Sequence, residues 1–306
     1  MKLRYFEHDP PNFGDALNAT MWDHLLPEGF LDQDESELFL GIGSILWGHL
    51  PKAPVKHVAG SGYGGYSDPP DMGDGSWNVL WVRGPVTART LGLDPRLAIA
   101  DSAVLLRETP LPAPRPGGVA FMPHFESAAR GNWARACALA GIDYLDPRGE
   151  VGDLLARIRG ARLLITEAMH GAIVADALRT PWIGIVPFFP QHRAKWEDWA
   201  ASLGIDLARA GLPPSNLLEL YTLATGQPGK GARSRRLLLS APAAPANAGL
   251  AHLAASRLRR LAERGSPQLS ADAAIKRATV RCREALDAFV AGRRGQARGM
   301  PRRVAP

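Results

Sequence analysis

The feature that most constrains this fold is a series of short apolar segments that each end in small or polar residues. They alternate with stretches of helical periodicity, an order that builds a mostly parallel sheet covered by helices. We therefore predict an α/β protein. In the first half of the chain, the predicted strands are residues 3–6, 37–42, 55–59, 78–82 and 97–100, and residues 14–26 form a predicted helix.

A second series of this kind follows residues 108–118, a proline-rich segment that we predict to be a linker. Its predicted strands are residues 119–122, 162–166 and 182–186, and its predicted helices are residues 132–140, 151–160 and 170–178. The sequence thus predicts two Rossmann-like domains, residues 1–110 and 111–228, facing each other across a cleft.

The composition changes near residue 227. Residues 230–306 hold 17 Lys/Arg and 4 Asp/Glu, whereas residues 1–229 hold 19 and 26. Residues 226–245 resemble a flexible linker, and two amphipathic helices follow, with apolar stripes at residues 250–261 and 275–289. We predict that residues 229–306 form a basic extension that attaches the protein to an anionic membrane surface or to an assembly; packing on the core is the alternative.

Composition also excludes several classes of protein. The acidic first part carries no recognition-helix or RNA-binding signature, so we expect no nucleic-acid partner. No apolar run reaches the ~18 to 20 residues of a membrane span, and the N-terminus lacks the centre of a signal peptide, so we expect a cytoplasmic protein, peripheral to the membrane at most. Cys137 and Cys282 match neither zinc-ligand spacing nor a disulfide framework and are expected to be reduced.

Ligands of open α/β sheets bind at the carboxyl ends of the strands, which directs attention to residues 165–178. There a strand delivers Glu167 and His170, and Gly171 opens the next helix, whose free N–H groups suit an anion. We predict a phosphate or carboxylate beside His170.

A second candidate is the cluster of Asn12, Gly14 and Asp15 at the start of the first helix. Asn12 or Asp15 could simply cap that helix, but in a two-domain cleft Asp15 is a candidate base. The turn at Gly43 and Ser44 would let a ligand approach backbone amides. Neither this turn nor the glycine-rich residues 60–65 form a dinucleotide fingerprint, and the chain has no P-loop.

Cations at strand ends complete the predicted site. Arg83 follows a strand directly, and Arg193 and Lys195 lie beyond the last predicted strand, so all three could hold an anion; solvated surface positions are the alternative. His124 follows a strand end and is a possible second histidine of the cleft. No metal motif such as H-x-x-x-H or CxxC occurs, and we expect neither a metal nor another cofactor.

The ordered set of motifs resembles the polysaccharide pyruvyl transferase family over roughly residues 8 to 200. The motifs are residues 12–15 (NFGD), 41–44 (GIGS), 81–85 (WVRGP), 101–103 (DSA) and 169–177 (MHGAIVADA). The resemblance implies a two-domain fold like that of GT-B glycosyltransferases. It also implies transfer of the enolpyruvyl unit of phosphoenolpyruvate to sugar hydroxyls, commonly as a cyclic ketal on an exopolysaccharide or cell-wall repeat unit.

By position, the resemblance implies that His170 is the active-site histidine, Asp15 the acidic residue and Arg83 an anion-holding arginine. The chain departs from many members at Ala168, where they carry arginine. The variant at residues 166–171 (TEAMHG) is similar to the subgroup acting on bacterial exopolysaccharides such as succinoglycan. The expected partners are phosphoenolpyruvate and an oligosaccharide acceptor, and the sequence leaves open whether that acceptor is lipid-linked.

The chemistry fits these residues independently of the resemblance. A histidine, which ordinarily titrates near neutral pH, could protonate the methylene carbon of the donor, Asp15 could accept the proton of the hydroxyl, and the cations could hold the anionic groups. Two alternatives stay open: a GT-B glycosyltransferase that uses a nucleotide sugar, and a non-catalytic scaffold.

Overall fold

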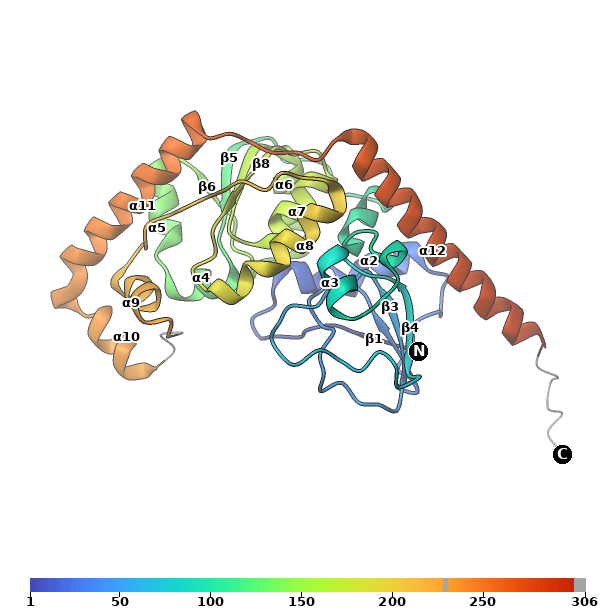
Figure 1. Cartoon of the computed structure of the whole chain (residues 1–306). Coiled ribbons are helices and arrows are strands. Elements are labelled where there is room, and N and C mark those ends of the chain that lie inside the picture. Colours follow the sequence, from blue (N-terminus) through green and yellow to red (C-terminus); the bar gives the residue numbers. More distant parts are fainter. Residues whose placement is uncertain (228–230, 300–306) are drawn as a thin grey trace.

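The computed structural model describes residues 1–227 and 231–299, and its described part contains two sheets whose strands all run parallel. Figure 1 shows the sheet of the first half in blue and cyan and that of the second half in green and yellow. Residues 109–116 connect the two without regular secondary structure, as the prolines predict. The prediction of an α/β protein is confirmed.

The first sheet follows the order of the chain. Its strands are β1 (Lys2–Arg4), β2 (Glu37–Leu40), β3 (Val55–Ala59) and β4 (Trp77–Trp81), with Leu3 paired to Phe39 and Phe39 to His57. This order has no reversal, so the sheet lacks the switch point of a Rossmann half. Helices α1 (Phe13–Ala16) and α2 (Asn18–Leu25) lie between β1 and β2 in the chain, and α3 (Pro85–Thr90) follows β4.

One predicted strand is wrong. Residues 97–100 form no strand: Leu97 ends the short 3₁₀ helix η1 (Pro95–Leu97), and Ala98 makes an isolated bridge to Val82. Asp94 causes this turn, because its carboxylate accepts a hydrogen bond of 2.9 Å from the backbone N–H of Arg96. A second 3₁₀ helix, η2 (Ser102–Glu108), follows and ends the first half.

The second sheet has the order β6 (Asp143–Tyr144), β5 (Gly117–Met122), β7 (Ala161–Thr166), β8 (Trp182–Ile185) and β9 (Arg209–Ala210). The chain reverses direction across this sheet between β5 and β7, and a ligand crevice is expected beyond the ends of these two strands. The helices of this half are α4 (Phe125–Arg130), α5 (Trp133–Ala140), α6 (Val151–Gly160), α7 (Met169–Ala177), α8 (Ala194–Leu203) and α9 (Leu217–Thr225), with η3 (Pro190–His192) before α8.

Local signals fix several of these boundaries. The carboxylate of Glu150 caps α6 by accepting hydrogen bonds from the N–H groups of Gly152 and Asp153, at 2.7 and 2.5 Å. Gly141 ends α5 with a φ of +68°, a conformation that favours glycine. Capping and helical periodicity thus place these ends where the sequence predicts them.

The two halves share one hydrophobic core. A continuous cluster of buried side chains extends from Trp22 and Phe39 in the first half to Ile173 and Trp182 in the second. A second cluster lies between the sheet of the second half and α11 (Ala244–Arg264), and includes Phe121 and Leu258. The shared core fixes the two sheets relative to each other.

The C-terminal helices belong to this folded unit. Helix α11 packs on α5, and Ala251, Ala254, Leu258 and Leu261 are buried there. The chain then returns to the first half as α12 (Asp272–Gly299), which Figure 1 shows in red beside the first sheet. The prediction that the tail is separate from the catalytic unit is wrong: amphipathic stripes show that a face is covered, but not what covers it.

Aromatic and charged contacts secure α12. The Phe289 ring lies 4.8 Å from that of His57 and 6.5 Å from that of Phe39, and Arg293 donates to both carboxylate oxygens of Glu37. The predicted flexible linker contains helix α10 (Ala232–Leu238) and the 3₁₀ helix η4 (Ala241–Ala243). Its residues 228–230 lie outside the described part, as do residues 300–306 of the tail.

Two further expectations concern the whole chain. Cys137 and Cys282 are both buried and unpaired by disulfide, as predicted. Within residues 1–227 and 231–299, none of the helices has the length and apolar character that crossing a bilayer requires.

Candidate active site

A cleft of about 710 Å³ lies between the two halves at the ends of their strands. From the first half it is lined by residues at or beyond the ends of β1, β2 and β3, and from the second half by residues that follow β5 and β7 and by residues in and after η3. Six of the predicted site residues line it: Asn12, Asp15, Ser44, His124, His170 and Lys195. The position agrees with the switch point between β5 and β7.

His170 is the second residue of α7, directly beyond β7. The turn before it is fixed by Thr166, whose hydroxyl oxygen accepts a hydrogen bond of 3.0 Å from the N–H of Ala168. The imidazole packs on the backbone of Gly14 so closely that a Cβ there would lie 2.0 Å from Nδ1. Gly14 is therefore required for the approach of α1 to His170, which joins the two predicted motifs.

Asp15 is the buried carboxylate of the cleft. Asn12 donates a hydrogen bond of 2.5 Å to its Oδ2, and burial raises the pKa of Asp15 although His170 and Asn12 act against the shift. Gly43 has a φ of +135°, and a Cβ there would approach Oδ1 of Asp15 to 3.2 Å. A carboxylate with a raised pKa is a stronger base than one in water. Asn12, Gly14, Asp15 and Gly43 thus form one cluster.

Arg83 is not at the cleft surface. Its side chain is fully buried, with Nε 3.2 Å from Asp198 of α8, Nη1 donating to the Ser44 hydroxyl at 2.7 Å and Nη2 donating to the Tyr63 carbonyl at 3.1 Å. Asp198 also accepts hydrogen bonds from the first turn of α3. The expectation that Arg83 binds the donor directly is corrected: its fork holds Ser44 in the wall and ties α8 to the first half.

Two predicted residues of the His170 loop lie behind the cleft. Glu167 is buried, and its carboxylate accepts hydrogen bonds from the N–H groups of His124 and Phe188 and from the Ser127 hydroxyl. Burial raises its pKa, and these three donors oppose the shift. A Cβ on Gly171 would lie 2.6 Å from the Thr166 hydroxyl, so this glycine lets α7 approach β7. Both residues shape the loops instead of contacting the cleft.

Lys195 and Arg193 separate in the structure. Lys195 lines the cleft, where burial and the nearby charge of Arg83 lower its pKa to about 8. The Arg193 guanidinium instead donates to the Pro187 carbonyl at 3.3 Å and is not among the residues that line the cleft. Of the two, Lys195 is the cation placed to contact an anion in the cleft.

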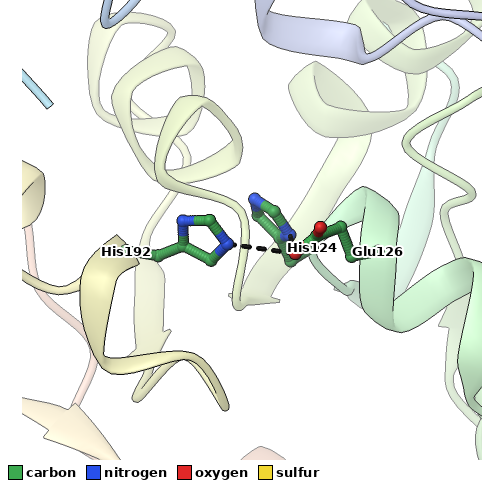
Figure 2. Close-up of side chains that lie close together, drawn as sticks. All are labelled: His124, Glu126 and His192. Carbon is green, nitrogen blue, oxygen red and sulfur yellow. Dashed lines mark hydrogen bonds and ion pairs between the residues drawn. The ribbon is translucent and has the colours of Figure 1, made fainter. Parts of the chain in front are cut away.

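The structure adds residues that the sequence analysis did not select. Figure 2 shows His192, from η3, facing Glu126 and His124 at the start of α4. Nε2 of His192 lies 3.0 Å from Oε2 of Glu126, and Nδ1 of His124 lies 3.7 Å from the same oxygen. Burial lowers the pKa of both imidazoles, that of His124 well below its usual value. The sequence analysis could not identify this cluster, because 66 positions separate Glu126 from His192 in the chain.

Asp101 is a further addition, although its motif contributes to the resemblance. Its side chain is buried, and its Oδ2 lies 3.5 Å from Nε2 of His170. Its Oδ1 accepts a hydrogen bond of 3.0 Å from the N–H of Ala103 at the start of η2. Asp101 directly follows the predicted strand 97–100, but the sequence analysis did not select it, because its contact with His170 arises only in the folded chain.

The sequence of this chain is similar to those of known proteins. The family model described as polysaccharide pyruvyl transferase matches residues 74–187, which include Asp101, His124 and His170. Over 227 residues the chain is 41% identical to the succinoglycan biosynthesis protein ExoV of Rhizobium meliloti (strain 1021). The aligned region covers 72% of this chain and 70% of that protein. No solved structure matches the chain. The family match and the extent of this identity agree with the cleft that brings the motifs together. The chain therefore belongs to the polysaccharide pyruvyl transferase family and is a pyruvyltransferase.

Proposed function

We propose that this enzyme transfers the pyruvyl unit of phosphoenolpyruvate to two hydroxyls of a sugar in an exopolysaccharide, forming a cyclic ketal and releasing phosphate. The observation that carries the proposal is the meeting of His170 and Asp15, from opposite halves of the molecule, in a cleft that also holds Lys195. An acid, a base and a cation are the groups that this reaction needs. No metal or other cofactor is needed for these steps.

The steps follow from the chemistry of the donor. The His170 imidazolium gives its proton to the methylene carbon, which becomes a methyl group and leaves the neighbouring carbon electron-poor. A sugar hydroxyl attacks that carbon, and its proton passes to Asp15. The bond between this carbon and the phosphate oxygen then breaks, and the phosphate leaves with the electron pair and takes the proton held by Asp15. A second hydroxyl closes the ketal, and its proton returns to His170.

Electrostatics support these roles. The raised pKa of Asp15 makes its carboxylate a better acceptor for the hydroxyl proton. Lys195, when protonated, offers a charge to the carboxylate or phosphate of the donor. Because Arg83 is occupied by Ser44, Tyr63 and Asp198, we assign it the positioning of the Ser44 wall. Ala168, where many members have arginine, leaves Lys195 as the proposed anion contact on this side.

The name of the relative from Rhizobium meliloti suggests the acceptor class. We propose an acidic exopolysaccharide of the succinoglycan type, built on lipid-linked repeat units at the inner face of the cytoplasmic membrane. The outward faces of α11 and α12 expose Arg259, Arg260, Lys276 and Arg277, which would attract anionic lipid headgroups. Flotation with vesicles containing phosphatidylglycerol tests this attachment: binding at low salt and release at high salt are expected, and no binding at low salt contradicts it.

We also propose that the two halves are arranged as in GT-B enzymes, with the donor on the second sheet and the acceptor on the first. The reversal between β5 and β7 supports a donor site beyond the second sheet, beside His124 and His170. The acceptor would then contact residues that follow β1, such as Tyr5 and Phe6.

The experiment that tests the function is an assay of phosphate release. Phosphoenolpyruvate is mixed with the enzyme and with succinoglycan repeat-unit oligosaccharides, and the sugar product is examined by mass spectrometry for the pyruvyl mass. Release that depends on the acceptor is expected. Thermal stabilisation by nucleotide sugars but not by phosphoenolpyruvate, with no release, would favour a glycosyltransferase instead.

A further inference from the structure

The cluster of His124, Glu126 and His192 in the cleft wall has the composition of a metal site (Figure 2). We propose that these three residues bind one divalent transition-metal ion, zinc by the character of their donor atoms. This inference goes beyond the proposed function, because the family resemblance and the reaction steps above require no metal. It rests on the positions of the three side chains.

The separations of the donor atoms suit such an ion. One ligand atom from each of the three residues can be chosen so that all lie within 4.8 Å of one another. Oε2 of Glu126 is 3.0 Å from Nε2 of His192 and 3.7 Å from Nδ1 of His124. A tetrahedral ion with bonds near 2.0–2.1 Å sets its ligand atoms ~3.3 Å apart, between these two values.

The chemistry of the donors selects the class of ion. Two imidazoles and one carboxylate form a borderline-soft set that zinc and its first-row neighbours prefer over magnesium or calcium. Two histidines and one glutamate are also a known ligand set of catalytic zinc, in which the fourth position stays open. His124, Glu126 and His192 all line the cleft, so the fourth position would face its interior.

The surroundings orient the ligands. The hydroxyl of Tyr66 lies 2.9 Å from Nδ1 of His192, which leaves Nε2 for the ion. Such an outer partner fixes the ring of a metal-binding histidine. On the other side, the backbone N–H of His124 is held by Glu167 at 3.0 Å, so the start of α4 is fixed.

Charge and protonation also agree. A metal-binding histidine must be neutral, and burial lowers the pKa of both imidazoles. Lys195 and Arg130 contribute positive charge near the histidines, so the Glu126 carboxylate is needed to offset the ion. If the proposed function holds, the ion and Lys195 would together attract the phosphate or carboxylate of the donor; binding of the ion itself does not depend on that.

The test measures zinc binding to the chelator-treated full-length protein by isothermal titration calorimetry. The absorption spectrum of the protein with cobalt in place of zinc is a second readout. We expect one ion per chain. His192→Ala and Glu126→Gln should each weaken the affinity by more than ~100-fold, and Tyr66→Phe by ~10- to 100-fold, as for loss of an outer partner. His49→Ala is the matched control, because His49 lines the same cleft outside the cluster, and it should bind zinc as the wild type does.

Several results would overturn the proposal. These are absence of stoichiometric zinc binding by the wild type, or equal affinity in the wild type, His192→Ala and Glu126→Gln. Circular dichroism of the metal-free variants shows whether they are folded. If a ligand variant is not, Tyr66→Phe still tests the site, because it removes only the hydroxyl and keeps the aromatic ring of residue 66. A failure of this inference can be distinguished from a failure of the proposed function. Zinc binding without phosphate release rejects only the function, and complete pyruvyl transfer without zinc binding rejects only the metal site.

Discussion

Nε2 of His170 lies 3.5 Å from a carboxylate oxygen of Asp101, and among the described residues neither atom has a hydrogen-bond partner. The pair joins the second half, through α7, to the first half, through the start of η2. Nε2 faces Asp101, and Nδ1 lies on the other side of the ring, against Gly14. The carboxylate therefore fixes which nitrogen of His170 can serve a substrate in the cleft.

Replacing His170 by Ala should lower turnover by ~10²- to 10⁴-fold, the usual contribution of a positioned acid. The fold should remain, because His170 is at the cleft surface and its loss leaves no buried charge except that of Asp101. The measurement is the initial rate of phosphate release, with circular dichroism as the control for folding. Activity near that of the wild type contradicts the role of His170 as the proton donor.

Asp101→Asn tests the positioning role of the carboxylate. We expect kcat to fall while the KM for the donor changes little, because Asp101 contacts His170 and does not line the cleft. If Asp101 acts through His170, the double variant with His170→Ala should be no slower than His170→Ala alone. An additional loss in the double variant would show that Asp101 has only a structural role or an independent one.

Much of this site could be predicted from the sequence, because local signals place it. A strand followed by a helix that carries His170 and Gly171 in its first turn needs only short-range periodicity, and the Asn12–Asp15 turn is a helix start. The close contact between Gly14 and the His170 ring then explains why both motifs occur together.

What could not be predicted depends on partners far away in the chain. Arg83 has the position of an anion-binding cation, but Asp198, 115 positions later, occupies its guanidinium. His124, Glu126 and His192 match no metal motif, because their proximity arises from the ends of β5 and β8. The basic tail shows the same limit, since its apolar stripes indicate a covered face but not which part of the protein covers it.

Lys195 predicts how donor capture depends on pH. Its pKa is lowered to about 8, so the ammonium is charged below that pH and loses its charge above it. We expect kcat/KM for phosphoenolpyruvate, which reports the free enzyme, to fall as the pH rises through about 8. In Lys195→Arg this alkaline fall should move to higher pH, since guanidinium stays charged. If the alkaline fall of kcat/KM is the same in Lys195→Arg as in the wild type, a group other than Lys195 causes it.

Arg83 and Asp198 predict a loss of stability. Arg83→Met leaves the buried carboxylate of Asp198 without its cation, and removing one partner of a buried pair costs about 3 to 5 kcal/mol of unfolding free energy. Urea unfolding measures this loss. Arg193→Met is the matched control and should change the free energy by less than about 0.5 kcal/mol, because Arg193 is half-buried and not ion-paired in the described structure. If Arg83→Met is as stable as the wild type but binds the donor more weakly, the sequence-based prediction that Arg83 binds an anion would be supported instead.

Removal of the tail should abolish the folded state. A chain that ends at residue 227 loses four large buried side chains, Leu258, Leu261, Ile275 and Leu286, each worth about 1.5 to 3 kcal/mol. Their sum, about 6 to 12 kcal/mol, is comparable to the whole stability of a typical domain. The surfaces that they cover on α5 and on the first sheet would face water, so we expect an insoluble or unfolded product by circular dichroism and size-exclusion chromatography. The control keeps the helices and changes only their outer charge: Arg260→Gln together with Arg277→Gln should leave the unfolding transition within about 0.5 kcal/mol of the wild type while weakening vesicle binding. A soluble truncated enzyme with wild-type turnover on an oligosaccharide acceptor would show that α11 and α12 are dispensable, and would return them to the role of an attachment.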